Sequence, residues 1–263
     1  MLAVKNVSFS YGNKPVLENV NLRVKRGDLV GIIGPNGSGK TTLLKLITGV
    51  LRPSRGHIET DGKDILSLDS KARARLISMV PQNPQLPLSF SVLDLVLMGR
   101  NPHLKLLQWE RLPDVRIARK AMQLTNTDHL ENLTLSKLSG GEQQRVVVAM
   151  AIAQQAPFLL LDEPTSSLDL THQIKVMDIV TQAQPSTDRA VLMAMHDLTL
   201  AAQYCERLIM LSHGRVIAEG SPAEVLTDKN IFEAYSVHAH VIPNPVHRTP
   251  LVLPYSNDSR PPD

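Results

Sequence analysis

The sequence predicts an α/β fold whose core is a parallel sheet. Four apolar runs of strand length recur along the chain: DLVGIIG, LISMVPQ, PFLLLDEP and AVLMAMHD. Helical or mixed sequence separates each run from the next, which is typical of parallel strands joined by crossover helices. The chain has 263 residues, of which 43% are hydrophobic, so it can bury a substantial core.

The N-terminal part instead has the pattern of antiparallel β structure. Apolar side chains alternate with polar ones from 7 to 11 and again from 20 to 24. A further strand-rich piece surrounds HIETDGKDI, in which Asp61 and Gly62 form a tight turn. We therefore expect an N-terminal antiparallel β subdomain beside the parallel core.

Three later regions complete the expected organisation. Residues from about 83 to 155 contain long helical segments and proline-marked loops, which predict a mostly helical insert. A hairpin with His213 and Gly214 at its turn follows the last core strand. The proline-rich end predicts an extended tail that finishes in disorder. The expected boundaries are a domain of residues 1–237 and a tail of residues 238–263.

Composition gives only limited information on the cellular compartment and on the binding partners. The net charge is +3 and no block of five or more like charges appears, which does not favour nucleic acid over an anionic ligand or a membrane surface. The single cysteine, Cys205, excludes an intramolecular disulfide and fits a reducing compartment. The chain opens without a secretory signal, and its apolar runs are too short to span a bilayer. We expect another chain to provide any membrane crossing.

Polar residues follow each apolar run at the point where the strand ends. They are Gly34, Gln82, Asp162 with Glu163, and His196. Ligands of open parallel sheets bind beyond the carboxyl ends of the strands. We expect these residues to serve one site.

The first strand end opens the sequence GPNGSGKTT, which matches the Walker A pattern between a strand and a helix. Backbone N–H groups of such a loop surround phosphates, and the helix adds its positive N-terminus. Lys40 is expected to contact the β- and γ-phosphates of ATP, and the Thr41 hydroxyl to ligate Mg²⁺. The alternative is a simple glycine turn that caps a helix. The expected nucleotide-binding residues are Gly34, Pro35, Asn36, Gly37, Ser38, Gly39, Lys40, Thr41 and Thr42. The fold class is therefore a P-loop NTPase with a RecA-like core.

The other strand ends supply candidate catalytic groups. Asp162 suits the Mg²⁺ shell, and Glu163 suits a base that orients the attacking water. Gln82 either completes the metal shell or holds the water, and His196 hydrogen-bonds the γ-phosphate. A carboxylate pair can also merely cap the next helix, but the Walker A loop favours catalysis.

A second serine-glycine-glycine sequence, LSGGEQQR, lies far downstream of the Walker A loop. Ser139 and Glu142 form a capping box, so the simplest interpretation is a helix start. A helix N-terminus also binds anions, and the chain's own nucleotide already has a phosphate loop. We therefore expect Ser139, Gly140, Gly141 and Glu142 to contact the γ-phosphate of a nucleotide held by another copy. Two subunits would then enclose two ATP molecules, head to tail.

These motifs together resemble the ATP-binding subunit of ABC transporters. The resemblance rests on Tyr11, GPNGSGKTT, Gln82, LSGGEQQR, LLLDEP, SSLD and His196, which follow the family's order from about residue 2 to 237. It implies that Tyr11 stacks on adenine and that Asp169 lies at the dimer interface. It also implies that the insert contacts membrane subunits. Met150 departs from the family, which often has arginine there, and this affects local packing more than catalysis.

Finer features resemble importers of iron-siderophore complexes, haem and cobalamin. They are FSVLDLVLMGRNPH, DLTHQ and the ending GSPAEVLT…VIPNPVHRTPLVLP. The resemblance implies a peripheral ATPase at the cytoplasmic face of the inner membrane, which powers import of a metal chelate through an integral-membrane permease. An extracytoplasmic substrate-binding protein would take part indirectly, and nucleic acid would not be a partner.

Two other functions fit parts of the sequence. A soluble ABC ATPase of DNA repair would carry a long coiled coil between Lys40 and Ser139, where the sequence has no heptad run, and translation factors usually carry two cassettes. A nucleotide sensor that binds without hydrolysing ATP would not need Glu163 and His196.

Overall fold

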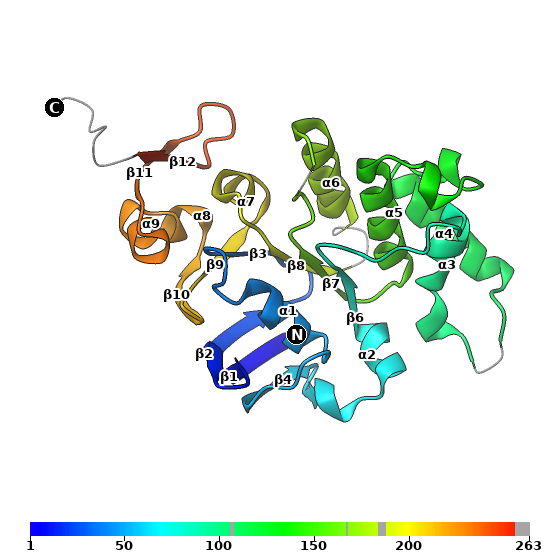
Figure 1. Cartoon of the computed structure of the whole chain (residues 1–263), viewed down its shortest axis with the longest axis horizontal. Coiled ribbons are helices and arrows are strands. Elements are labelled where there is room, and N and C mark those ends of the chain that lie inside the picture. Colours follow the sequence, from blue (N-terminus) through cyan, green and yellow to red (C-terminus); the bar gives the residue numbers. More distant parts are fainter. Residues whose placement is uncertain (106–107, 167, 184–187, 256–263) are drawn as a thin grey trace. The chain divides into compact units, whose positions relative to one another are not determined.

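The computed structural model describes residues 1–105, 108–166, 168–183 and 188–255 (Figure 1). The chain forms two compact units. The first unit comprises Met1–Leu66 with Leu192–Asp263, and the second comprises Ser67–Val191.

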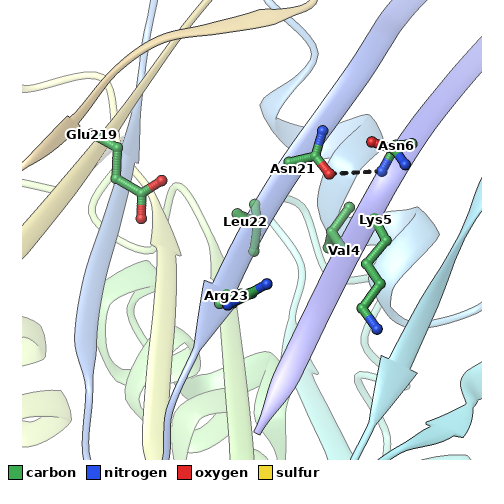
Figure 2. A pocket seen from close by; sticks show the side chains of 7 residues that line it. All are labelled: Val4, Lys5, Asn6, Asn21, Leu22, Arg23 and Glu219. Atoms are coloured by element: carbon green, nitrogen blue, oxygen red, sulfur yellow. Dashed lines mark hydrogen bonds between the residues drawn. The ribbon is translucent and has the colours of Figure 1, made fainter.

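An antiparallel sheet forms the N-terminal part of the first unit. Its strands are β1 (Leu2–Tyr11), β2 (Lys14–Val24), β4 (Arg55–Thr60) and β5 (Lys63–Asp64), in the order β2-β1-β4-β5. The predicted β subdomain and its turn at Asp61 and Gly62 are thereby confirmed. Figure 2 shows Asn6 of β1 beside Asn21 of β2, where the Asn6 backbone N–H donates to the Asn21 side chain at 2.9 Å. A pocket of about 420 Å³ lies there, and Glu219 lines its other side.

Parallel strand pairing positions the first predicted motif. Strand β3 (Leu29–Ile33) pairs in parallel with β9 (Arg207–Ser212), and β9 forms a hairpin with β10 (Arg215–Gly220). The helices α1 (Lys40–Ile47) and α7 (Leu198–Tyr204) belong to the same unit. Strand β8 (Ala190–Ala194) runs from the second unit into the first, where Met195 donates its backbone N–H to Ile32 at 2.9 Å.

The C-terminal segment differs from the expected extended tail. After α8 (Pro222–Val225) and α9 (Asp228–Tyr235), strands β11 (His238–Pro243) and β12 (Pro250–Tyr255) pair as an antiparallel hairpin. Strand β11 packs on α9 and β12 packs on α7. Two of the prolines that suggest a strap, Pro243 and Pro250, lie opposite each other at the loop end of the hairpin. The expected disorder at 256–263 lies outside the described residues.

The second unit combines two strands with helices. Strand β6 (Ile77–Val80) follows α2 (Ser70–Leu76) and pairs in parallel with β7 (Phe158–Asp162). Between them lie α3 (Val92–Met98), α4 (Leu112–Leu124) and α5 (Gly140–Ala153), and α6 (Leu170–Ala183) follows β7. The three helices α3, α4 and α5 pack on one another within the predicted insert. Short 3₁₀ turns occupy Ile65–Ser67, Asn101–His103, Asp128–Leu130 and Leu135–Lys137.

Helix α5 is the centre of this unit. Its run from Val146 to Ala149 is fully buried, so the helix is apolar on several sides and is covered by α3, α4 and α6. At Met150, where the family often has arginine, the backbone oxygen would lie 2.3 Å from a Cβ at Gly99. Glycine at position 99 therefore lets the end of α3 approach the backbone of α5.

Candidate active site

The predicted site residues divide between the two units. The Walker A loop, Tyr11 and His196 belong to the first unit. Gln82, the carboxylates after β7, Asp169 and the SGGE sequence belong to the second.

The Walker A loop connects β3 to α1 in the predicted strand-loop-helix arrangement. Gly34 has φ of 149°, and a Cβ there would lie 2.1 Å from the backbone oxygen of Leu211 on β9. Gly39, with φ of 105°, is the N-cap of α1, and no side chain caps this helix. Only glycine fits this backbone at Gly34.

Lys40 is held by the loop that it follows. Its Nζ donates to the carbonyl oxygens of Gly34 at 2.7 Å and Pro35 at 3.3 Å, and the residue is only 5% exposed. The ammonium group therefore already lies inside the loop. Phosphate oxygens carry formal charge and accept stronger hydrogen bonds from an ammonium group than peptide carbonyls do.

Tyr11 and His196 are exposed side chains at strand ends of the first unit. Tyr11 is half exposed, and its ring meets Phe9 edge-on with centroids 4.8 Å apart. His196 follows the fully buried β8 and precedes Asp197, whose carboxylate caps α7 by accepting from Leu200 at 2.8 Å. Both rings are accessible to a ligand.

In the second unit the structure brings Gln82 and Glu163 together. Gln82 Nε2 donates to Glu163 Oε2 at 2.7 Å. Gln82 follows β6 and Glu163 follows β7, and these two strands are neighbours in the sheet. The hydrogen bond therefore joins two residues that lie 81 positions apart in the sequence. Asp162 ends β7 and is 2% exposed.

Glu163 has an unusual backbone conformation for a non-glycine residue. Its φ is 48°, and such left-handed residues typically cost about 1–3 kcal/mol. The turn stabilises it, because Ser166 donates both its N–H and its hydroxyl to the Glu163 carbonyl oxygen at 3.1 and 2.9 Å. The strand β7 ends at Asp162, directly before this residue.

The SGGE sequence starts α5 with the predicted capping box. Glu142 Oε2 accepts from the backbone N–H and the hydroxyl of Ser139 at 2.8 and 2.7 Å. In return, Ser139 Oγ accepts from the Glu142 N–H at 3.4 Å. The Ser139 hydroxyl and then its N–H lower the pKa of Glu142 below its ordinary value. The helix start is therefore confirmed, and the anion-binding role stays a prediction.

Asp169 lies directly before α6 and accepts hydrogen bonds from the first turn of that helix. Its Oδ1 accepts from the backbone N–H of His172 at 2.9 Å and lies 2.8 Å from His172 Nδ1. The backbone bond, followed by the ring, lowers the pKa of Asp169. The contact of His172 with Asp169 was not predicted from the sequence, although the three-residue spacing within DLTHQ could have suggested it.

Tyr235 is a second residue that the sequence analysis missed. Its hydroxyl is buried at the end of α9, and the backbone N–H of Gly34 faces it. Burial raises the pKa of Tyr235, and the Gly34 N–H opposes that shift. No sequence signal connects these residues, because they lie at opposite ends of the chain.

Within the described ranges, no group of three or more His, Cys, Asp or Glu residues is placed to hold a metal ion. No helix in that part of the chain is long and apolar enough to cross a membrane.

Known proteins resemble the chain in sequence and in fold. A family model described as ABC transporter matches residues 17–166, which is more than half of the chain. The chain belongs to the ABC transporter family.

Individual relatives of this ABC protein are named as transport or import ATP-binding proteins. The ferric enterobactin transport ATP-binding protein of Escherichia coli is 37% identical, over 95% of this chain and 92% of the relative. The hemin import ATP-binding protein of Gloeobacter violaceus is 40% identical, over 98% and 96%. The cobalamin import ATP-binding protein of Halobacterium salinarum is 39% identical over 96% of this chain, which spans only 63% of that relative.

Solved structures agree with this family assignment. A metal-chelate type ABC transporter in an inward-facing conformation matches with a TM-score of 0.85 and 28% identity, over 98% of both chains. A dimeric ATP-binding cassette in a post-hydrolysis state with ADP and Pi matches with a TM-score of 0.74 and 30% identity. That match covers 84% of this chain and 99% of the cassette.

Proposed function

We propose that this ABC protein hydrolyses ATP to power import of a metal chelate through a membrane permease. The observation that carries the proposal is the Walker A loop, whose glycine backbone and buried Lys40 are arranged around a helix start that no side chain caps. Two relatives that the chain matches over more than nine tenths of their length are named as a ferric enterobactin transport and a hemin import ATP-binding protein, which supports the cargo class.

The residues of the phosphate loop bind and orient the nucleotide in this proposal. Residues 34–42 surround the phosphates with backbone N–H groups, and Lys40 moves from the loop carbonyls to the β- and γ-phosphates. Tyr11 stacks its exposed ring on adenine, and His196 donates to the γ-phosphate. ATP is therefore bound by side chains and backbone of the first unit.

Mg²⁺ fits the donor set that the chain offers. It prefers a few oxygen ligands together with substrate phosphates, and Thr41, Asp162 and Gln82 provide a hydroxyl, a buried carboxylate and an amide oxygen. When bound, the ion neutralises charge that develops on the phosphate oxygens. Gln82 also donates from its amide nitrogen to Glu163, so a single side chain links the metal shell to the base.

Glu163 acts as the base for the attacking water. Gln82 occupies one of its carboxylate oxygens at 2.7 Å, which orients the group. The Glu163 carboxylate accepts a proton from the water as the new oxygen–phosphorus bond forms and the bond between the γ-phosphorus and the bridging oxygen breaks, which releases ADP. The left-handed backbone at Glu163 fixes this orientation at the strand end.

The proposed working form is a head-to-tail homodimer with two ATP molecules at its interface. Ser139, Gly140, Gly141 and Glu142 of each copy contact the γ-phosphate bound by the partner, and Asp169 lies at the interface. The dimeric cassette with ADP and Pi supports this assembly for the family. We place the dimer peripherally at the cytoplasmic face of the inner membrane, on a permease that receives cargo from an extracytoplasmic binding protein. The alternative, a soluble ABC ATPase of DNA repair or translation, lacks comparable support.

Glu163→Gln tests the enzymatic part of the proposal. The amide keeps the shape of the side chain but cannot accept the proton, so hydrolysis should fall by roughly two to four orders of magnitude while ATP still binds. The variant should accumulate as an ATP-bound dimer on size-exclusion chromatography. Glu233→Gln on the exposed side of α9 is the matched control and should hydrolyse ATP normally. Normal turnover in the Glu163 variant would remove Glu163 from the mechanism.

The same variant tests the cargo class in cells. Replacing the native gene with the Glu163→Gln form should abolish uptake of one labelled chelate among a ferric siderophore, haem and cobalamin. Unchanged uptake of all three, together with sensitivity to DNA damage or defective translation, would favour the soluble alternative.

A further inference from the structure

The two glycines of the SGGE sequence have different surroundings. Neither has a positive φ, so the helix itself does not require glycine at either position. A Cβ on Gly140 would meet nothing within 4 Å. A Cβ on Gly141 would lie 2.4 Å from Cδ2 and 2.9 Å from Nε2 of His172. Position 141 therefore requires glycine for a steric reason, because the His172 ring occupies the space that a Cβ would need.

The His172 ring is held in place from its other side. Nδ1 lies 2.8 Å from Asp169 Oδ1, and the same oxygen accepts from the His172 backbone N–H at 2.9 Å. Two contacts to one carboxylate oxygen fix the side chain against rotation. The ring is thus fixed between Asp169 and the first turn of α5.

We propose that His172 is a positioning residue that sets the distance between Asp169 and Gly141 of the SGGE sequence. The inference rests on the proposed dimer, in which Asp169 lies at the interface and Gly141 faces the partner's nucleotide. Asp169, His172 and Gly141 form one continuous chain of contacts within a single unit. Displacing Asp169 then displaces the helix start that serves the other copy.

The first experiment measures dimer formation and turnover separately from ATP binding. His172→Ala should leave the ATP affinity of the monomer within twofold of wild type, because the Walker A loop is untouched. It should reduce kcat, and ATP-driven dimerisation in the Glu163→Gln background, about tenfold. His172→Asn should recover little of this loss, because its amide reaches Asp169 from nearly the same position as Nδ1 but lacks the ring atoms that face Gly141. Lys175→Ala, exposed on the same helix, is the control and should match wild type.

Two outcomes of that experiment would overturn the inference. In the first, His172→Ala dimerises and hydrolyses ATP as wild type does. In the second, His172→Asn dimerises and hydrolyses ATP as wild type does, which would show that the ring atoms facing Gly141 are not needed.

The second experiment tests the contact itself by thermal unfolding of the nucleotide-free monomer. Gly141→Ala should lower the melting temperature, whereas Gly140→Ala should not, because a helix prefers alanine and space is available there. In the His172→Ala background the penalty of Gly141→Ala should disappear. An equal penalty in both backgrounds would show that the ring does not restrict Gly141.

Ser139→Phe separates failure of this inference from failure of the proposed function. If Ser139→Phe blocks dimerisation but His172→Ala does not, the shared site stands and His172 has no positioning role. If Ser139→Phe dimerises normally, the proposed dimer site itself is wrong and the inference falls with it.

Discussion

The Walker A loop and the SGGE sequence are both glycine-rich helix starts, but they are built differently. Glycine is required at Gly34 by a positive φ and by the nearby backbone of Leu211, and the first turn of α1 has no side-chain cap. In SGGE the glycines are helical, and Ser139 with Glu142 caps the helix. The first is the loop that we propose to bind phosphate within one chain. In the second, the N–H and hydroxyl of Ser139 donate to Glu142 of the same chain.

The largest effect should come from the Walker A loop. Lys40→Ala removes the ammonium group that the loop carbonyls hold, so ATP binding should weaken and hydrolysis fall by about three orders of magnitude. Isothermal titration and a phosphate-release assay measure the two quantities. Lys45→Ala in the last turn of α1 is the matched control and should retain activity. Hydrolysis at the wild-type rate by Lys40→Ala would mean that the loop is only structural.

A smaller effect, without loss of ATP binding, should follow Ser139→Phe. The monomer's own phosphate loop stays intact, whereas the bulky ring blocks the partner's nucleotide, so turnover should fall about a hundredfold. Asn132→Phe, at an exposed position upstream, serves as the control. Mixing Ser139→Phe with Lys40→Ala chains should restore partial activity, because one site of the mixed dimer keeps both elements. Normal dimerisation by Ser139→Phe would leave SGGE as an ordinary helix cap.

The smallest effect concerns the cap itself. Glu142→Ala removes one half of the capping box and should destabilise the protein by about 1 kcal/mol. Glu224→Ala removes the equivalent carboxylate from the capping box of α8, so a similar fall in melting temperature is expected. Only the Glu142 variant should also change ATP-driven dimerisation. Equal dimerisation by both variants would remove Glu142 from the shared site.

The stabilisation from Glu142 should depend on pH in a defined direction. Folding lowers the pKa of Glu142, so its carboxylate contributes stability above the ordinary value of 4.5. That contribution is lost as the pH falls through the lowered value. The melting temperatures of wild type and Glu142→Ala should therefore converge in acid and separate near neutral pH.

Local patterns explain which features the sequence predicted. The apolar strands, the Walker A turn and the capping box each depend on neighbouring residues, and the structure contains all three. The Gln82–Glu163 bond was not predictable, because it depends on β6 lying beside β7. The contact between His172 and Gly141 depends on how α6 packs against α5. The C-terminal hairpin was missed because its prolines obscure the strand pattern.

The surroundings of Gly34 have a consequence for how the protein is made. The loop follows β3 near the start of the chain, yet Leu211 and Tyr235, which contact Gly34, are synthesised near its end. At about 5–20 residues per second, a ribosome exposes the Walker A residues many seconds before these contacts can form. The nascent chain thus exposes the phosphate loop well before Leu211 and Tyr235 are available to pack against Gly34.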